Sequence, residues 1–518
     1  MYFFIFFIAN QLITSNIKTT FSENYNFEAG SAFRIPHSAF RIPHSAFRIP
    51  HSAMIQSPVF QILQALPPAT LRALDKFIAS PYHVTHAGVT ALYEYLRAQP
   101  AGDPGKTLHK ETVAKQLGET PERLYHLTSY LLEAVEQFLA LETWRQHPRE
   151  SHALVVEALR RLQLDDLSAT MLRYARKRLQ ADPYRGSGYH RADFALHLEA
   201  YHLSQQQGRA KIFNLQELSE AQDVAFVCEK LRTGCMLLSH QAVSKKEYDK
   251  GLLNQVLQFL DGHPYLQIPS VAAYYHGYYA LAGATGSDAH FRLLKNILEQ
   301  HTVQFSVAEV HDLYLMAINF CIRRINQSEE SYFRHVFDLY QSGLEHGALL
   351  EGGALSRWTY NNIAIAALKL REFDWTFRFL NDYAALLPEM HREGALNFNL
   401  ARYYYDTGNY RQSMQHLVRM EYDDVLQNLI AKTLLCKIYY ELDEYDALEN
   451  QLDSIEIYLR RKKVLGYHKE NYTAIVRLMR KLLSLDANNT AQKKAILQQV
   501  EAAPGLSERD WFLKQLAR

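Results

Sequence analysis

Apolar residues recur at spacings of three and four positions from Met54 to the end of the chain, the pattern of one face of an α-helix. One long helix is expected after Ser306, which forms a capping box with Glu309. Another is expected after Thr120, with Pro121 at its first position. We find no clear run of alternating apolar and polar residues bounded by turn signals. The pattern therefore predicts an all-α protein after Met54.

Four breaks rich in glycine, proline and small polar residues interrupt this pattern. They lie at 99–107, 182–188, 283–288 and 346–353. The helix-sized segments between them often come in pairs with short connections, which is typical of antiparallel helix pairs. We predict an N-terminal helical module over 54–146 and an α-solenoid of helix pairs over 150–518.

Internal repeats within 357–460 make the prediction more specific. Three stretches fit one helix-turn-helix template, with offsets of 37 and 35 residues. They share a core slot in the first helix, a small residue after it, an aromatic residue that opens the second helix and a core slot within that helix. The core slot of the first helix holds Ile363, Leu400 and Leu435, and the small residue after it is Ala364, Ala401 or Cys436. The aromatic residue is Phe373, Tyr410 or Tyr445, and the core slot of the second helix holds Leu380, Leu417 and Leu452. The offsets are close to those of a tetratricopeptide (TPR) repeat, whose helix pairs form a core by stacking. The expected fold is therefore a TPR-like α-solenoid.

The same segments resemble those of a family of uncharacterised bacterial TPR-like helical-repeat proteins. The resemblance covers nearly everything after Met54. It is carried by FIASPYHVT at 77–85, NFCIRRIN at 319–326, SRWTYNNI at 356–363, REFDWTFRFL at 371–380, LARYYYDTGNY at 400–410 and KIYYELDEYDALENQLDSIEIYLRR at 437–461. It implies a helical-repeat fold, and it brings no reaction, ligand or partner with it.

The first 53 residues differ from the rest. Residues 31–51 are three perfect copies of SAFRIPH. Tandem copies of the heptanucleotide CATTCCG would encode all seven residue types, so we interpret 1–53 as an upstream DNA repeat read in frame, with translation starting at Met54. The alternative is a genuine disordered tail, because perfect low-complexity repeats seldom need a packed core. The apolar run from Tyr2 to Ala9 is too short for a membrane helix and lacks the features of a secretory signal.

Composition and charge narrow the function. The chain has 56 Lys and Arg against 55 Asp and Glu, a net charge of +1, which argues against a protein whose main partner is nucleic acid or an acidic membrane. With 22 Gly and 16 Pro, collagen-like and disordered classes are excluded. Four cysteines make no disulfide framework; Cys228 and Cys235 share a helix face, and the others lie in apolar stretches. We expect reduced, structural thiols in a cytoplasmic protein.

Candidate catalytic and ligand motifs are all incomplete. The stretch PGKT at 104–107 lacks the first glycine of a phosphate-binding loop and follows no strand. The pairs His83/His86 and His197/His202 have no carboxylate at ligand spacing. There is no nucleophile elbow and no dinucleotide-binding loop. We therefore expect no enzymatic activity, no cofactor and no metal.

Two local clusters have alternative interpretations. The run 459–481 holds eight Lys and Arg against one acid, Glu470, and could belong to a regulatory protein that contacts nucleic acid. A solvated basic helix face is the plainer interpretation. The tyrosines of 272–283 could form a binding surface, but packing between helices is the favoured interpretation.

The predicted function is a non-enzymatic protein–protein interaction scaffold that binds a peptide or protein in a concave groove. First helices of TPR-like pairs line that groove, and amides, cations and tyrosines recur beside their core slots. The candidate peptide-binding residues are Asn362, Asn399, Arg402, Tyr405, Lys437 and Tyr440. Such donors and acceptors at regular spacing suit an extended peptide. Asn361 and Ile365 occupy the two basic positions of a carboxylate clamp, so acidic C-termini are not the expected ligands. The alternative is that these side chains are merely solvated.

Overall fold

The computed structural model describes ten stretches of the chain. They are 57–99, 108–146, 148–206, 213–244, 246–283, 285–418, 425–461, 466–486, 489–503 and 505–518. The predictions about the extension at 1–53, the start at Met54 and the PGKT stretch lie outside these residues.

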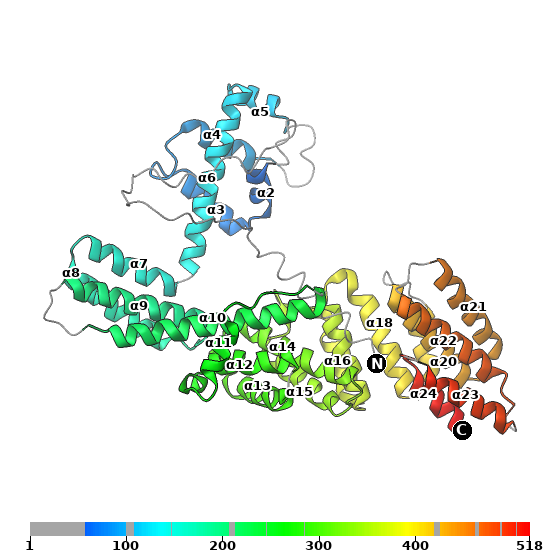
Figure 1. Ribbon diagram of the computed structural model, residues 1–518. Coiled ribbons are helices and arrows are strands. Elements are labelled where there is room, and N and C mark those ends of the chain that lie inside the picture. The colour runs from blue at the N-terminus through cyan, green and yellow to red at the C-terminus, as the bar shows by residue number, and fades with distance from the viewer. Residues whose placement is uncertain are drawn as a thin grey trace. The chain divides into compact units, whose positions relative to one another are not determined.

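The described residues belong to the all-α class, as predicted, with one two-stranded hairpin as the exception (Figure 1). They form two compact units. One, here the N-terminal unit, holds the described residues up to Leu179 together with 195–215, and the other, the C-terminal unit, holds 180–194 and 216–518. The predicted boundary near residue 148 differs from this division, because the helices just after it group with the N-terminal helices.

The N-terminal unit begins with a small helical core. Its long central helix starts after Thr120, whose hydroxyl accepts a hydrogen bond from the Arg123 amide at 3.3 Å, as the capping pattern predicts. Three further helices follow. The elements are α2 (Pro58–Ala65), α3 (Pro68–Ile78), α4 (Ala87–Arg97), α5 (Lys110–Leu117), α6 (Pro121–Gln146), α7 (Pro148–Arg161), α8 (Asp165–Ala181) and α9 (Ser187–Gln206), of which α9 contributes to both units.

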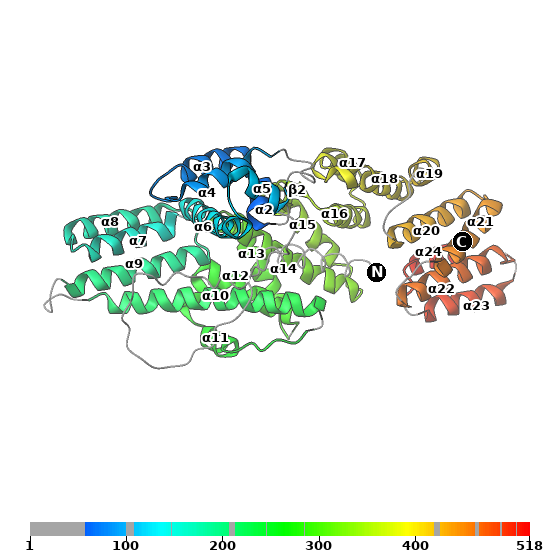
Figure 2. The same cartoon turned by 90° about the horizontal axis from the view of Figure 1, so that it is seen from above.

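The C-terminal unit holds the remaining elements, and Figure 2 shows its helices from above. The elements are α10 (Leu215–Ser244), α11 (Leu253–Leu260), η2 (Pro264–Gln267), α12 (Pro269–Ala282), α13 (Ser287–His301), η3 (Thr302–Gln304), α14 (Val307–Asn326), α15 (Tyr332–Glu345), β1 (Leu350–Glu351), β2 (Ala354–Leu355), α16 (Arg357–Lys369), α17 (Phe373–Asp382), η4 (Ala384–Leu386), α18 (Glu389–Asp406), α19 (Tyr410–Val418), α20 (Val425–Glu441), α21 (Tyr445–Arg461), α22 (Gly466–Leu483), α23 (Thr490–Ala502) and α24 (Arg509–Ala517).

The predicted capping box at Ser306 is confirmed, and its carboxylate has a second role. The Ser306 hydroxyl accepts from the Glu309 amide, and the Glu309 side chain accepts from the Ser306 amide. The Glu309 carboxylate also accepts the backbone amide of Ser187 at 2.8 Å, so it ties the start of α9 to the start of α14.

A small antiparallel hairpin was not predicted from the sequence. Strands β1 and β2 are two residues each, and Gly352 and Gly353 between them have φ of +58° and +83°. Two consecutive positive φ angles form the tight turn that favours glycine at both central positions. Strands this short carry no alternating pattern that a sequence could reveal.

The helix starts and core slots predicted for the three aligned stretches agree with the structure. The second helices α17, α19 and α21 begin at Phe373, Tyr410 and Tyr445. Every core slot assigned to the three copies is buried. The turns match as well, since Arg371, Gly408 and Asp443 occupy one register position and all have φ between +58° and +80°.

The tyrosine and cysteine predictions are confirmed. Three of the four tyrosines in α12, namely Tyr274, Tyr275 and Tyr278, are buried. All four cysteines are free and buried. Among the residues that the structure describes, no helix has the length and apolar character needed to cross a membrane.

Candidate functional site

Two of the predicted groove residues are buried inside the protein. Asn362 is 5% exposed and Asn399 is fully buried. The Asn399 side-chain amide donates to the Asn361 side-chain oxygen at 2.6 Å and to the Ala395 carbonyl at 2.9 Å. The prediction that these positions face an open groove is therefore wrong, because the slot beside the core position faces the neighbouring helix pair and its amides join α18 to α16.

Two more predicted residues, Arg402 and Tyr405, lie half-buried on α18. Burial lowers the pKa of the Arg402 guanidinium, although the carboxylate of Asp406 acts in the opposite direction. Burial also raises the pKa of Tyr405. The ammonium of Lys437 lies 4.5 Å from the centre of the Tyr405 ring.

The last two predicted residues, Lys437 and Tyr440, contact the end of the same chain. The Lys437 ammonium pairs with the Glu508 carboxylate at 2.8 Å, and the Tyr440 ring meets the Trp511 ring edge-on at 5.3 Å. Although burial acts to raise the pKa of Glu508, the charge of Lys437 holds it below its usual value. The C-terminal segment thus meets positions that the sequence assigned to a peptide, and peptide binding there stays a prediction.

The residues of the two predicted histidine pairs contact neighbouring side chains and backbone atoms, as residues with a structural role do. The His83 ring stacks on Phe77 with centroids 3.9 Å apart, and His86 Nδ1 accepts from the Gly88 amide at 3.0 Å. The His197 carbonyl accepts from the Asn214 side chain at 3.0 Å. In the described part of the chain, no three His, Cys, Asp or Glu side chains lie close enough together to hold a metal ion.

A buried serine–histidine contact in the C-terminal unit was missed by the sequence reasoning. His190 Nε2 lies 2.9 Å from the Ser270 hydroxyl, and the Cys228 thiol of α10 interacts with the same hydroxyl. Burial lowers the pKa of His190 and raises the pKa of the Cys228 thiol to about 12. Because the Ser270 hydroxyl is fully buried, it cannot meet a substrate, and the group joins α9, α10 and α12.

The basic run near the C-terminus is partly neutralised by its own chain. The Arg480 guanidinium pairs with Asp453 at 2.6 Å and with Glu456 at 3.0 Å. The Lys481 ammonium donates to Gln499 at 2.6 Å. This internal pairing gives no support to a nucleic-acid contact.

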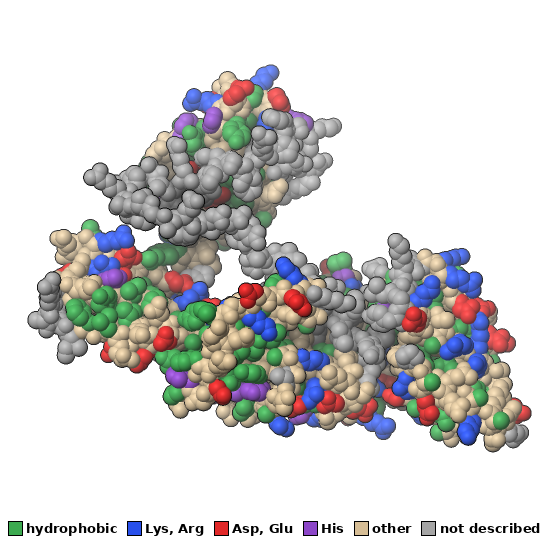
Figure 3. Space-filling view, viewed as in Figure 1, with side chains coloured by type: hydrophobic (Ala, Val, Ile, Leu, Met, Phe, Trp, Pro, Cys, Tyr) green, Lys and Arg blue, Asp and Glu red, His purple; other side chains and the backbone are tan. Residues whose placement is uncertain are grey.

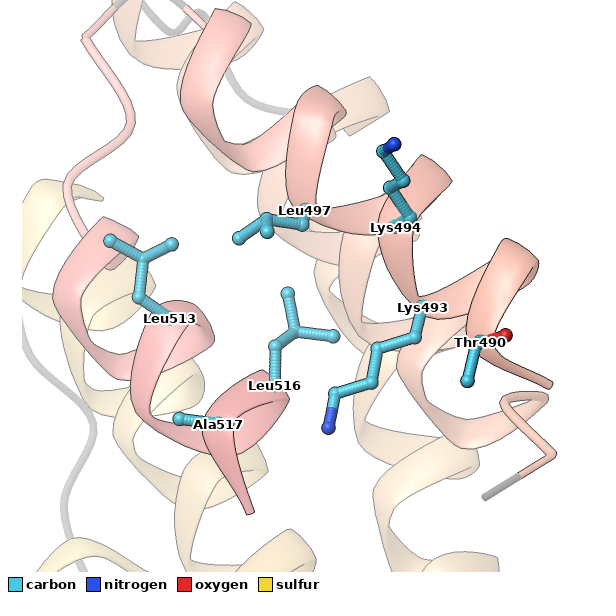
Figure 4. Close-up of a pocket in the computed structure, with 7 residues that line it drawn as sticks. All are labelled: Thr490, Lys493, Lys494, Leu497, Leu513, Leu516 and Ala517. Carbon is cyan, nitrogen blue, oxygen red and sulfur yellow. The ribbon is translucent and has the colours of Figure 1, made fainter. Parts of the chain in front are cut away.

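A shallow pocket lies between α23 and α24 (Figure 4). Its lining residues are Thr490, Lys493, Lys494, Leu497, Leu513, Leu516 and Ala517. The surface is almost wholly apolar, with lysines at its rim. An open apolar depression of this kind defines no ligand.

The most unusual surface belongs to the hairpin of α7 and α8. Of the 24 large hydrophobic side chains that are exposed among the described residues, six fall between positions 154 and 174. Figure 3 shows hydrophobic side chains gathered over this hairpin, at the left of the view. We call these six side chains the α7–α8 surface: Leu154, Val155, Leu162, Leu164, Leu167 and Tyr174. Large exposed apolar side chains gathered on one hairpin mark an interaction site or a packing face.

The α7–α8 hairpin shares its local geometry with the α18–α19 pair. The Ser168 hydroxyl donates to the Val156 carbonyl at 3.1 Å, just as the Ser413 hydroxyl donates to the Ala401 carbonyl at 2.6 Å. The turn residue Gln163 has φ of +60°, at the register position of Gly408. The hairpin thus resembles the α18–α19 pair. Ser168 and Ser413 each stand twelve residues after the carbonyl that they bond, and this spacing is the signal that could have revealed the likeness.

This register identifies what is unusual about the α7–α8 surface. Leu154 aligns with the buried Asn399, and Val155 aligns with Leu400, which is 9% exposed. Leu154 itself is 51% exposed and Val155 is 36% exposed. The two slots that are covered in the later pairs are therefore open in this one.

Buried and exposed charges frame the hairpin. On its inner side, the Arg160 guanidinium forms two hydrogen bonds with the Glu199 carboxylate, at 2.9 and 3.3 Å, and anchors α7 to α9. On α8, Asp165 and Asp166 stand at the first turn. The later turns carry the cations Arg173, Arg176, Lys177 and Arg178. The helix is thus acidic at one end and basic at the other, as the helix dipole favours.

No family model, curated protein or solved structure matches this chain. The resemblance to bacterial TPR-like proteins stays a prediction.

Proposed function

We propose that this protein is a non-enzymatic protein-binding scaffold, a TPR-like α-solenoid of antiparallel helix pairs that docks a protein on the α7–α8 surface. The observation that carries the proposal is the exposure of Leu154 and Val155 at slots that the later pairs bury. The cytoplasmic setting and the absence of a cofactor belong to the same proposal.

The physical basis is the way helix pairs obtain a core. One pair has too little apolar surface to be stable alone, so each buries a stripe against its neighbours. In the later pairs Leu434 and Leu435 pack in one cluster with Phe398 and Leu417 of the preceding pair. In the described chain before α7, at 57–99 and 108–146, no such pair covers this stripe, because α6 belongs to a separate core with Leu74 and Phe138. The stripe of α7 is left for a partner.

The stripe is large enough to matter energetically. Complete burial of a leucine side chain contributes roughly 1.5–3 kcal/mol, and this surface offers about half of that area for each of several side chains. Binding must also offset the loss of translational and rotational freedom. A few well-packed apolar anchors usually supply most of the affinity of an interface. Leu154, Leu162 and Leu167 are the best placed for that role, since each is more than half exposed.

The test is affinity capture from the native cell with quantitative mass spectrometry. A double variant, Leu154→Asp with Leu167→Asp, places charges on the α7–α8 surface. The matched control is Leu293→Asp with Val303→Asp, two exposed apolar residues of the C-terminal unit. We expect proteins captured by the wild type and by the control to be lost with the α7–α8 variant. Equal recovery of the same proteins by all three would overturn the proposal.

A further inference from the structure

We propose that one face of α20 is a binding site for an amphipathic helix of another protein, and that the chain's own last helix, α24, occupies this site until such a helix displaces it. The residues of this face, here called the α20 face, are Lys437, Tyr440 and Glu441. The site shares no residue with the α7–α8 surface, so the inference goes beyond the proposed function.

The α20 face is covered by the C-terminal segment of the same chain. Its three residues lie three and four positions apart, so they share one side of the helix. Each of them contacts one residue of the C-terminal segment: the pairs are Lys437 with Glu508 at 2.8 Å, Tyr440 with Trp511 at 5.3 Å between ring centres, and Glu441 with Gln515 at 2.6 Å. A helix that only continued a stack would contact the pair just before it, α22 and α23. Instead α24 reaches α20, one pair further back.

The α24 helix has the form of a helical ligand. Trp511, Phe512 and Leu516 are buried, and so is Gln515 between them, whereas Asp510 is exposed. Positions 511, 512, 515 and 516 share one side of a helix, and amphipathic helices bind through anchors at this spacing. The partner that fits the site is therefore an amphipathic helix with an aromatic anchor and an acid three residues before it.

The site has binding capacity that α24 does not use. Trp511 Nε1 is buried and has no hydrogen-bond partner among the residues that the structure describes, and an unpaired buried donor opposes the binding of α24. Arg402 of α18 recurs at the register position of Lys437 and forms no ion pair within the described stretches. Although burial acts to raise the pKa of the Glu508 carboxyl, the nearby charges of Lys437 and Arg402 hold it below its usual value. A partner helix with a second acid can pair with both cations.

Release of α24 requires little else to move. It is the last helix and has nine residues. Its packing against α23 leaves the open depression shown in Figure 4. Just before it, the Ser507 amide donates to the Asn471 side chain of α22 at 3.0 Å, and that side chain donates to the Ser507 hydroxyl at 3.1 Å. A terminal helix can detach beyond such a fixed point while the pairs before it stay folded.

The test is the binding of a labelled synthetic peptide, with the sequence of residues 505–518, to the full chain, followed by fluorescence anisotropy. The wild type should bind it weakly, because its own α24 is present at a far higher effective concentration. Glu508→Lys in the chain sets the introduced lysine against Lys437, so the same peptide should bind at least about tenfold more tightly. Trp511→Ala in the peptide should weaken that binding about tenfold, since buried aromatic anchors supply most of the affinity.

An exchange of charges identifies the site. A chain with Lys437→Glu should reject the wild-type peptide and bind a peptide that carries Glu508→Lys. A chain with both substitutions should cover its own site again and bind either peptide only weakly. The matched control is Glu501→Lys, which changes an exposed acid on α23 and should bind the peptide as weakly as the wild type.

Hydrogen exchange with mass spectrometry follows α24 in each chain. Glu508→Lys should speed exchange in 509–517 and leave α20 to α23 protected. Exchange that accelerates equally from α20 to α24 would show that α24 is part of one cooperative core, and would overturn the proposal. A peptide that binds none of these chains, or all of them equally, overturns it as well. None of these results bears on the α7–α8 surface, which the capture experiment tests separately.

Discussion

A substitution in the turn between the two helices of a pair tests the backbone conformation there almost without altering any side-chain contact. Gly408 has φ of +80°, and no atom lies within 4 Å of the place where a β-carbon would stand. Gly408→Ala therefore introduces no clash. An L-residue in this left-handed region costs roughly 1–2 kcal/mol, and the smaller entropy of the unfolded alanine chain returns about 0.4–1 kcal/mol. We expect the α18–α19 pair to lose about 1 kcal/mol.

At the equivalent turns of the other two pairs, the opposite substitution, from a larger residue to glycine, can be made. Arg371 and Asp443 have φ of +59° and +58° and already bear the strain that alanine would add at Gly408. Arg371→Gly should therefore stabilise its pair by up to about 1 kcal/mol. Asp443→Gly should gain less, because aspartate tolerates the left-handed region better and because its carboxylate accepts the Tyr445 hydroxyl at 2.7 Å.

Hydrogen exchange with mass spectrometry is the suitable assay, since a chain of two units need not unfold in one step. A loss of about 1 kcal/mol corresponds to roughly fivefold faster exchange in α18 and α19. Arg371→Gly should slow exchange in α16 and α17. Unchanged or slower exchange in Gly408→Ala, or faster exchange in Arg371→Gly, would refute the assignment of a strained turn to this register position.

Three further perturbations test the packing of the unit cores. Burial, with a smaller effect of His290, lowers the pKa of His276 from 6.5 to about 4. Between these values the unfolded chain binds more protons than the folded chain, so the full stability should be present above pH 6.5 and about 1 kcal/mol of it should be lost toward pH 4, after allowance for partial exposure. The melting temperature measures this loss, and an equal drop in His276→Gln would contradict its assignment to His276. Gly186→Ala should cost about 1–3 kcal/mol, because the new β-carbon would overlap the Glu309 carboxylate and displace it from the Ser187 amide. Thermal melting checks this, and a variant as stable as the wild type would show that the hydrogen bond to the Ser187 amide contributes little to stability. Leu452→Ala should lower the free energy of unfolding, measured with denaturant, by about 2–5 kcal/mol. Ile457→Ala, at an exposed site on the same helix, should lower it far less. Equal losses of unfolding free energy in the two variants would contradict the assignment of Leu452 to the core.

Local features of this protein follow from the sequence alone. Helix periodicity, the capping box at Ser306 and the aromatic residues that open α17, α19 and α21 are set by residues a few positions apart. The core slots of the three predicted stretches follow too, because burying an apolar side chain away from water is favourable wherever a neighbouring helix can cover it. The burial of the cysteines and of the α12 tyrosines belongs to the same class of inference.

Each helix packs one face against the other helix of its pair, and only the tertiary structure decided which of its other faces are covered. Asn362 and Asn399 are polar and read as exposed, yet an amide can be buried once a second amide accepts its hydrogen bond, as Asn361 does. Lys437 meets Glu508 across 71 residues of chain, a contact that no local pattern encodes. Conversely, Leu154 and Val155 look like core residues and lie open, because burial requires a neighbouring helix pair and α6 joins a different core. Periodicity identifies the face that packs within a pair, but the contacts between pairs depend on which elements the folded chain brings together.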